Sequence, residues 1–474
     1  MAIVTLCAGG CAVGPDYRRP PLSEAKAYTP KAYTRMPIAS TPAGAGDVQH
    51  FDSDAKVPAQ WWQAFGSPEI NELVEHAFQR SPTLDAAKAA LRQAQENRAA
   101  QYAGYFPTLQ ADYSASRQRE AVSTISPTLD SGDALYTLHT AQLSVSYTPD
   151  VFGLNRRAVE SLAAQEAAQR FELDAAYTTL AANIVSTAIE LASLEAQLRA
   201  MQAASVAAHD ASTLVQQQLA AGAVSGLDVA AQDTAAAQAD AAIPPLEKQL
   251  EQTRNLLATL IGEPPDTINI HIDIDSLKLP MHLPLSLPST LIETRPDVRA
   301  AEAQVQAASA EVGVAIANRL PQFTITAAYG GTSTQFSKMF TDGNIFWNLL
   351  GGLTQPIFDF GALKHRQGAA EAALEQAIAQ YRQTVLSAFQ NVADSLYALD
   401  ADAKGLQASE RAEAAAKKTR DLAQIQLDAG AINRLTLLGT EQVYQEAKLA
   451  RIQAQASRFT DTAALYQSLG GALD

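Results

Sequence analysis

The sequence contains little cysteine, little basic charge and no long apolar run. Its two cysteines, Cys7 and Cys11, both lie near the start of the 474 residues. A disulfide framework in the body of the chain and a cysteine-rich metal site are therefore excluded. The 50 acidic residues exceed the 35 lysines and arginines, which gives a net charge of −15. This balance argues against a nucleic-acid partner, because phosphate binding needs clustered lysine and arginine.

Motifs of enzymes and of membrane-spanning helices are also missing from the sequence. No stretch reaches about eighteen consecutive strongly apolar residues, the minimum for a transmembrane helix. There is no glycine-rich phosphate loop, no Gly-x-Ser-x-Gly and no His-Glu-x-x-His, and the seven histidines are scattered. The alternating stretch His271–Asp275 is more typical of a short edge strand than of a metal cluster. We therefore expect no enzyme activity, no cofactor and no metal.

The N-terminal segment has the composition of an export signal followed by an extended leader. Residues 1–10 are apolar and rich in small residues, and we interpret them as a residual signal peptide. Cleavage before Cys11 would give a lipid-anchored N-terminus, whereas an ordinary signal would leave a cysteine without a role. Residues 11–66 are rich in proline, which predicts an extended leader. Trp61 and Trp62 are interpreted as an anchor of this leader to the body rather than as a binding platform.

The rest of the sequence repeats itself. Two prolines have counterparts 214 positions later, and three glycines have counterparts 208 positions later. The pairs are Pro82 with Pro296, Pro107 with Pro321, Gly153 with Gly361, Gly222 with Gly430, and Gly262 with Gly470. This spacing indicates a tandem duplication of roughly two hundred residues, and duplicated units usually pack with pseudo-symmetry. We assign residues 67–262 to repeat 1, 263–290 to a linker, 291–470 to repeat 2 and 471–474 to a C-terminal tail.

Each repeat is predicted to contain a helix followed by a β-hairpin. In repeat 1 the helix runs from Glu69 to about Tyr105, and the hairpin occupies residues 108–148; the hairpin of repeat 2 occupies 322–357. Apolar and polar residues alternate along these segments, which is the period of a strand. A single hairpin is marginal in water. The four strands therefore pair with each other alone, or join strands of other chains in a closed barrel that is apolar outside and polar inside.

Each repeat is then predicted to continue into a pair of very long helices, at residues 154–262 and 361–470. Leucine, isoleucine and alanine recur at intervals of three, four and seven, as in a coiled coil. The helix from about Arg157 to Ala221 has some sixty residues and a length on the order of 100 Å. Glycine-containing turns at residues 222–226 and 430–433 reverse the chain. The predicted fold class is a mixed α and β protein with two antiparallel coiled-coil hairpins.

An ordered set of motifs resembles a known family over essentially the whole chain. The motifs are Cys11-Ala12-Val13-Gly14-Pro15-Asp16-Tyr17, Trp61-Trp62, Ser81-Pro82-Thr83-Leu84, Tyr105-Phe106-Pro107, Arg295-Pro296-Asp297-Val298 with Ala301-Glu302, Gln355-Pro356-Ile357-Phe358, and Leu469-Gly470-Gly471. This set resembles the TolC/OprM outer-membrane factors. It is most similar to the lipoprotein branch that serves RND-type efflux systems.

The resemblance implies a membrane protein of a Gram-negative outer membrane. It implies a homotrimer whose twelve-stranded β-barrel, four strands per chain, is continued by a periplasmic α-helical barrel. The implied function is the passive exit duct of a tripartite efflux pump in multidrug resistance, taking small molecules from an inner-membrane RND-type pump through a periplasmic adaptor (membrane fusion protein). It also implies that Cys11 is lipidated and carries palmitate. The alternatives are the duct of a type I protein-secretion system and a soluble periplasmic coiled-coil adaptor or scaffold.

Candidate functional residues follow from this architecture. Threefold symmetry would turn an inward residue near the hairpin tips into a ring, and a carboxylate ring would filter cations. The gate candidates are Leu227, Asp228, Asp233, Leu435, Thr436, Gly439 and Glu441. The tips implied to meet the adaptor are Gly222, Ala223, Val224, Gly430, Ala431 and Ile432, and the helix–strand transitions are Pro107, Pro149, Pro321 and Pro356. Family members often carry aspartate where this chain has Thr436 or Gly439, so Asp228 provides the stronger ring. Alternatively, Asp228 only caps the returning helix.

Overall fold

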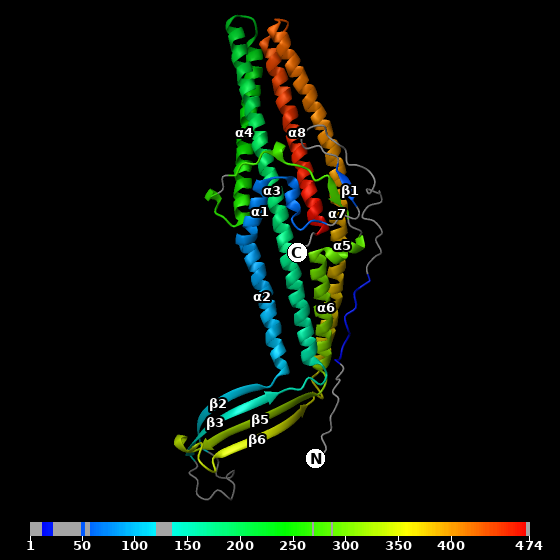
Figure 1. Cartoon of the computed structure of the whole chain (residues 1–474). Coiled ribbons are helices and arrows are strands. Elements are labelled where there is room, and N and C mark those ends of the chain that lie inside the picture. The colour runs from blue at the N-terminus through cyan, green and yellow to red at the C-terminus, as the bar shows by residue number, and fades with distance from the viewer. Residues whose placement is uncertain are drawn as a thin grey trace. The chain divides into compact units, whose positions relative to one another are not determined.

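The computed structural model describes residues 12–21, 49–52, 57–119, 135–267, 270–285 and 288–470 (Figure 1). The residual signal peptide, Cys11, most of the leader and the C-terminal tail lie outside these residues. The chain divides into two compact units. We call residues 1–20, 92–168 and 301–380 the sheet unit, and residues 21–91, 169–300 and 381–474 the hairpin unit.

The sheet unit contains one four-stranded antiparallel sheet. Its strands are β2 (Thr108–Arg119), β3 (Leu135–Tyr147), β5 (Gln322–Ser333) and β6 (Ile345–Thr354), in the order β2-β3-β5-β6 (Figure 1). Within the described residues, the edge strands β2 and β6 each pair with one neighbour only. The predicted last strand reached Ile357, but β6 ends at Thr354, because Pro356 has no N–H to donate to a ladder.

Large apolar side chains of this sheet lie exposed rather than in a core. They include Leu109, Tyr113, Leu143, Tyr329, Trp347, Leu349 and Leu353, which are between 50% and 75% exposed. A soluble sheet buries such a face against a second layer. The exposed face is therefore suited to an apolar environment.

The chain contains four long helices, which form two pairs of matched length. Helices α3 (Leu154–Ala220) and α7 (Ala362–Asp428) both have 67 residues, and α4 (Gly226–Ile261) and α8 (Arg434–Leu469) both have 36. Helix α4 follows α3, and α8 follows α7, in antiparallel pairs (Figure 1). Pro244 and Pro245 lie inside α4, which continues through them. Among the described residues, no helix has both the length and the apolar character needed to cross a bilayer.

The shorter helices correct one prediction. A single helix was expected from Glu69 to about Tyr105, but α1 (Pro68–Arg80) ends before α2 (Pro82–Tyr102), and the 3₁₀ helix η2 covers Ala103–Tyr105. Ser81 between them is extended, with φ −67° and ψ 121°, because the residue before a proline avoids the helical region.

The second repeat has the same interruption. Helices α5 (Pro288–Thr294) and α6 (Pro296–Ala317) are separated at Arg295, the residue before Pro296. Helix α5 crosses the position between residues 290 and 291 where we divided the linker from repeat 2.

The core of the hairpin unit includes the predicted anchor of the leader. Trp61 and Trp62 lie in the 3₁₀ helix η1 (Trp61–Phe65) and are only 2% and 1% exposed. The Trp61 ring stacks on Tyr466 of α8 at 5.4 Å between ring centroids, and the Trp62 ring meets the edge of Phe78 of α1 at 5.4 Å. The interpretation of this pair as an anchor is confirmed.

The linker differs from its prediction. Residues His271–Asp275 were expected to form an edge strand, but the 3₁₀ helix η5 (Ile274–Ser276) begins there, because the Asp273 carboxylate accepts a bond from the Asp275 N–H. The linker strand is β4 (His282–Pro284) instead, and it pairs in parallel with β1 (His50–Asp52) of the leader. Two three-residue strands are too short for a sequence period to reveal them. The residues described contain no cluster suited to a metal ion.

Candidate functional site

The first hairpin turn begins at the C-terminal end of α3. Gly222 has φ +71°, a left-handed conformation that glycine adopts without strain. The Ala223 N–H donates to the Gln218 carbonyl and the Gly222 N–H donates to the Leu219 carbonyl, both at 2.8 Å. These two bonds satisfy carbonyls that the helix end would leave unpaired, as in a Schellman motif. The chain is thus reversed within a few residues.

The second turn has the same geometry at the end of α7. Gly430 has φ +69°, its N–H donates to Leu427, and the Ala431 N–H donates to Gln426 at 2.8 Å. In both turns the glycine and the following alanine are exposed, and the third residue, Val224 or Ile432, is half-buried. All six predicted tip residues therefore lie in two equivalent surface turns of the hairpin unit.

Asp228 closes the N-terminal cap of α4. Its carboxylate accepts bonds from the N–H and the hydroxyl of Ser225, at 2.9 and 2.8 Å, and Ser225 Oγ accepts from the Asp228 N–H at 3.4 Å. This reciprocal arrangement is a capping box. The bonds from the Ser225 N–H and hydroxyl lower the pKa of the exposed Asp228 carboxyl. The structure therefore contains the cap that we gave as the alternative role of Asp228.

The N-terminal cap of α8 contains only one half of a capping box. Asn433 is the cap residue, and its side-chain oxygen accepts from the N–H and the hydroxyl of Thr436, both at 2.9 Å. Thr436 occupies the position of Asp228 but brings no charge to it. One carboxylate per chain is thus present at the start of the returning helices, on α4.

The two remaining acidic candidates make bonds between the helices of a hairpin. Asp233 on α4 accepts from Ser212 and Gln216 of α3, at 2.5 and 3.2 Å. Glu441 on α8 lies 3.7 Å from the guanidinium of Arg420 on α7. In the described residues, no hydrogen bond or ion pair joins Asp228, Asp233 and Glu441 to each other, so a single chain does not bring them together.

The uncharged gate candidates differ in their surroundings. Leu227 is 79% exposed. Leu435 is half-buried. Gly439 is exposed, and a side chain added there would meet open space.

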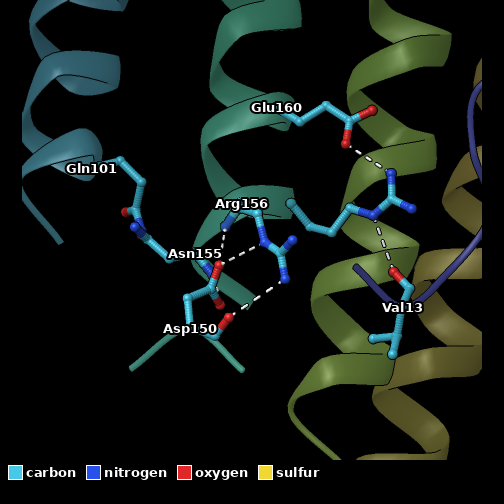
Figure 2. A network of polar contacts seen from close by, with 7 residues as sticks. Val13, Gln101, Asp150, Asn155, Arg156 and Glu160 are labelled. Carbon is cyan, nitrogen blue, oxygen red and sulfur yellow. Dashed lines mark hydrogen bonds and ion pairs between the residues drawn. The ribbon is translucent and has the colours of Figure 1, made fainter. Parts of the chain in front are cut away.

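In the sheet unit, a buried arginine binds the leader a few residues after position 12. The Arg157 side chain on α3 is 5% exposed, and its guanidinium donates to the carbonyls of Val13 and Gly14, at 3.0 and 3.3 Å. It also binds the carboxylates of Asp16 and Glu160, both at 2.8 Å. Figure 2 shows two of these partners, Val13 and Glu160, together with the neighbouring Arg156 and its bond to Asp150. Arg157 is a functional candidate that sequence reasoning missed, because its partners in the leader lie about 140 positions away.

Residues of the family motif complete this docking site. The Tyr17 hydroxyl and the Arg19 guanidinium bind the two carboxylate oxygens of Glu302 on α6, at 2.9 and 2.6 Å. Gly14 has φ +96° and approaches Gly313 so closely that an added Cβ would lie 2.5 Å from its Cα. Residues 13–19 are therefore held by specific contacts with α3 and α6, although Cys11 itself lies outside the described residues.

The four predicted transition prolines stand where helices and strands meet. Pro107 lies between η2 and β2, Pro149 follows β3, Pro321 lies between α6 and β5, and Pro356 follows β6. Each proline interrupts backbone hydrogen bonding at an element boundary. Pro149 and Pro321 line a cleft of about 330 Å³ together with Phe106, Val151 and Phe152.

The hairpin unit also contains a pair of carboxyl groups that sequence reasoning did not connect. Asp402 on α7 and Asp461 on α8 face one cavity, where two like charges would repel each other. Burial, followed by the influence of Asp461, raises the pKa of Asp402 to about 7. Both line a polar cavity of about 460 Å³ that Glu190 of α3 also reaches. Burial likewise raises the pKa of Glu190.

The combination of an exposed four-stranded sheet and two long helical hairpins corresponds to a known family. A family model described as outer membrane efflux protein matches residues 73–263 and 287–471. The chain belongs to the outer membrane efflux protein family. This membership makes it an efflux channel protein of the Gram-negative outer membrane, in a family of transport proteins rather than enzymes.

Individual relatives agree with this assignment along most of the channel's length. The pyoverdine export outer membrane protein OpmQ of Pseudomonas aeruginosa is 32% identical over 423 residues, 88% of each chain. The probable efflux pump outer membrane protein TtgC of Pseudomonas putida is 28% identical, over 99% of this chain and 94% of that one. The solved outer-membrane channel OprN has a TM-score of 0.82 and 26% identity, with 98% and 100% of the two chains covered. The alternative of a periplasmic coiled-coil adaptor is therefore excluded.

Proposed function

We propose that three copies of the chain form a passive exit duct of a tripartite efflux pump. Twelve strands, four from each copy, close into a β-barrel in the outer membrane, and the helical hairpins form an α-helical barrel in the periplasm. Small molecules enter at the periplasmic end and leave without any energy coupling in the duct itself. An inner-membrane RND-type pump selects them, and a periplasmic adaptor connects the pump to the duct.

The observation that carries this proposal is the open four-stranded sheet, whose two edges are unpaired within the described residues. Strands β2 and β6 leave their outer edges unpaired in the described part of the chain, and large apolar side chains lie exposed on the sheet. Open edges invite pairing with another chain, and closure into a barrel removes them. A barrel surrounded by lipid also gives the exposed apolar residues a suitable environment. One chain with four strands is too small to close around a duct.

The equal halves of the chain support a tandem duplication. The long helices have matched lengths of 67 and 36 residues, and the family model matches two separate segments. Three copies with two hairpins each would give a tube with pseudo-sixfold symmetry. The exposed turns at Gly222–Val224 and Gly430–Ile432 would then form its rim, where the adaptor binds.

We place the gate near the same end of the duct. Asp228 of three copies would form a ring of like charges, and Thr436 would form an uncharged ring beside it. Leu227, Asp233, Leu435, Gly439 and Glu441 are the neighbouring candidates. The lowered pKa of Asp228 keeps its carboxylate charged, which a cation-selective ring requires. The capping role of Asp228 is compatible with this, because a capping carboxylate remains exposed to water.

We also propose that Cys11 is the lipidated N-terminus. Arg157 and Glu302 bind the leader just after Ala12, and the Ala12 Cα lies 2.7 Å from where a Cβ on Gly153 would be. Gly153 follows the β3 transition at Pro149, so the anchor would be tethered at the end of the sheet that meets the helices. Replacing Cys11 with alanine should abolish fatty-acid labelling; persistent labelling would assign the lipid elsewhere.

Two measurements test the function. The purified protein should require detergent and migrate as a heat-modifiable trimer, and a detergent-free monomer in the periplasm would refute the barrel. Deleting the protein should raise the intracellular accumulation of several drugs and dyes, with restoration by the intact gene. Unchanged accumulation together with loss of an exported protein would instead support a type I secretion duct.

A further inference from the structure

Two exposed aromatic clusters flank the sheet at its two edges. The β2-side cluster consists of Tyr102, Tyr105 and Phe106, directly before β2, with ring centroids 5.2 and 6.1 Å from that of Tyr102. The β6-side cluster consists of Ile357, Phe358 and Phe360, directly after β6, with the two phenylalanine rings 4.5 Å apart. The exposed fractions are 54% for Tyr102, 59% for Phe106, 90% for Ile357, 76% for Phe358 and 89% for Phe360. Exposed apolar surface of this kind marks an interaction site.

The β6-side cluster is held out at a cost to the backbone. Phe360 has φ +55°, the one positive φ among the described non-glycine residues. A bulky residue in this region is strained, and such strain persists only where the surroundings impose it. The Asp359 carboxylate imposes it here, because it accepts bonds from the N–H groups of Gly361 and Leu363, at 2.9 and 2.8 Å. A strained backbone that presents an exposed ring suggests that the ring has a partner.

The strand register shows why the two clusters cannot meet within one copy. Thr108 at the start of β2 pairs with Ser146, which pairs with Thr326, which pairs with Leu350 near the end of β6. The start of β2 and the end of β6 therefore lie at the same end of the sheet, on opposite edges. Three strand spacings of about 4.8 Å separate those edges.

A second copy of the chain brings the clusters together. Because the four strands alternate in direction, β6 runs antiparallel to β2. When β6 of one copy pairs with β2 of the next, the residue after the end of β6 lies beside the residue before the start of β2. We infer that the β6-side cluster of each copy packs against the β2-side cluster of its neighbour, as an aromatic seal between copies where strands meet helices. This inference rests on the proposed trimer and assigns it an interface.

Engineered disulfides test the contact directly. Two double variants, Phe106→Cys with Ile357→Cys and Tyr102→Cys with Phe358→Cys, are purified in detergent, oxidised mildly and run without reductant. We expect at least one pair to give covalent dimers and trimers that a reductant converts back to single chains. The unmodified protein controls for Cys7 and Cys11. A third variant, Tyr102→Cys with Phe340→Cys, controls for exposure alone, because Phe340 is 61% exposed but lies in the connection at the other end of β5 and β6.

The possible outcomes separate this inference from the proposed function. Covalent species from a tested pair and none from the Phe340 control support the aromatic seal. An intact trimer that forms no covalent species in either tested pair overturns the seal and leaves the barrel standing, as it would if the rings inserted into lipid. A monomer in native mass measurements overturns the trimer itself.

Substitution of Phe360 with glycine gives a second, independent readout. Glycine relieves the strain of φ +55°, so a ring without a partner would make this variant equal to or more stable than the parent. The aromatic seal predicts the opposite, a lower temperature for dissociation of the detergent-resistant trimer. Phe340→Ala serves as the control for loss of an exposed ring.

Discussion

Arg157 on α3 and Asp16 of the leader form a 2.8 Å ion pair in which the arginine is almost completely buried and the aspartate is 89% exposed. The buried partner belongs to the body, so it pre-forms the binding site, and the exposed partner arrives with the leader. Backbone carbonyls of Val13 and Gly14 complete the coordination of the guanidinium. Arg157 therefore recognises the leader through two backbone carbonyls and one carboxylate.

Arg157→Met should release the leader while it retains an apolar stem in the same space. Charge-assisted hydrogen bonds to a buried guanidinium contribute about 1–3 kcal/mol, so we expect residues 12–19 to become accessible to protease. The measurement is the rate of N-terminal cleavage followed by mass spectrometry. Arg156→Met is the matched control, because it removes the neighbouring arginine, which binds Asp150. Equal cleavage rates in both variants would contradict the role of Arg157.

Asp402→Asn should change the pH dependence of stability. The pKa of Asp402 is raised from its ordinary value of 3.8 to about 7, so between about pH 4 and pH 7 the folded state binds more protons than the unfolded state. The stability contributed by the neutral Asp402 carboxyl is complete below that window and is lost as pH rises through 7. Asparagine is neutral at every pH, so it adds no buried charge beside Asp461.

We therefore expect Asp402→Asn to flatten the decline in stability between pH 4 and 7 and to raise stability above pH 7. The gain should be about 1 kcal/mol, less than the full pKa shift implies, since water reaches the half-buried pair. Thermal unfolding at pH 5 and pH 8 measures it. The charged groups that face the pair are Glu190 and Arg458, and Glu190→Gln controls for a general loss of negative charge in the cavity. A parallel shift of Tm at both pH values would refute the raised pKa of Asp402.

Asp228 offers two variants that separate charge from capping. In Asp228→Asn the amide oxygen can still accept from the Ser225 N–H, so the cap is retained and the charge is lost. In Asp228→Ala both are lost. If Asp228 forms a gate ring, both variants should reduce cation selectivity in planar bilayers to a similar extent. If only Asp228→Ala has an effect, the residue is a helix cap and no gate residue.

Three glycines with the same backbone conformation should respond differently to alanine. Gly222 and Gly430 have open space where a Cβ would stand, so alanine costs only the left-handed backbone, about 1–2 kcal/mol. At Gly262, with φ +80°, an added Cβ would lie 2.5 Å from the Arg80 carbonyl oxygen. Gly262→Ala should therefore lower Tm more than either turn variant. Equal decreases in Tm for the three variants would mean that the backbone at Arg80 can move away from the added Cβ at little cost.

The length of the periodic segments decided how well the sequence predicted the fold. The strands around Leu109 and Phe323 and the helices of the two hairpins appear where period-two alternation and heptads placed them. The break at Ser81 was missed although Pro82 marked it, because helical periodicity on both sides hid it. Strands β1 and β4 have three residues each, too few for any period.

The candidate site shows the same division. The glycines of both hairpin turns could be identified from local sequence, because a left-handed residue at a helix end favours glycine wherever it occurs. The cap at Asp228 could also be anticipated, since its partner Ser225 is three residues away. Nothing local linked Asp402 with Asp461, or Arg157 with Asp16. These pairs come from different elements, and only packing brings them within reach.

By itself, the sequence determined the repeated order of elements, the alternating strands, the long helices and the turns between them. Each of these depends on interactions among residues close in the chain. The tertiary structure alone decided the sheet order, the position of the leader at Arg157 and the placement of Asp402 and Asp461 on one cavity. Those features join residues far apart in sequence, and their energies depend on burial, which no local pattern specifies.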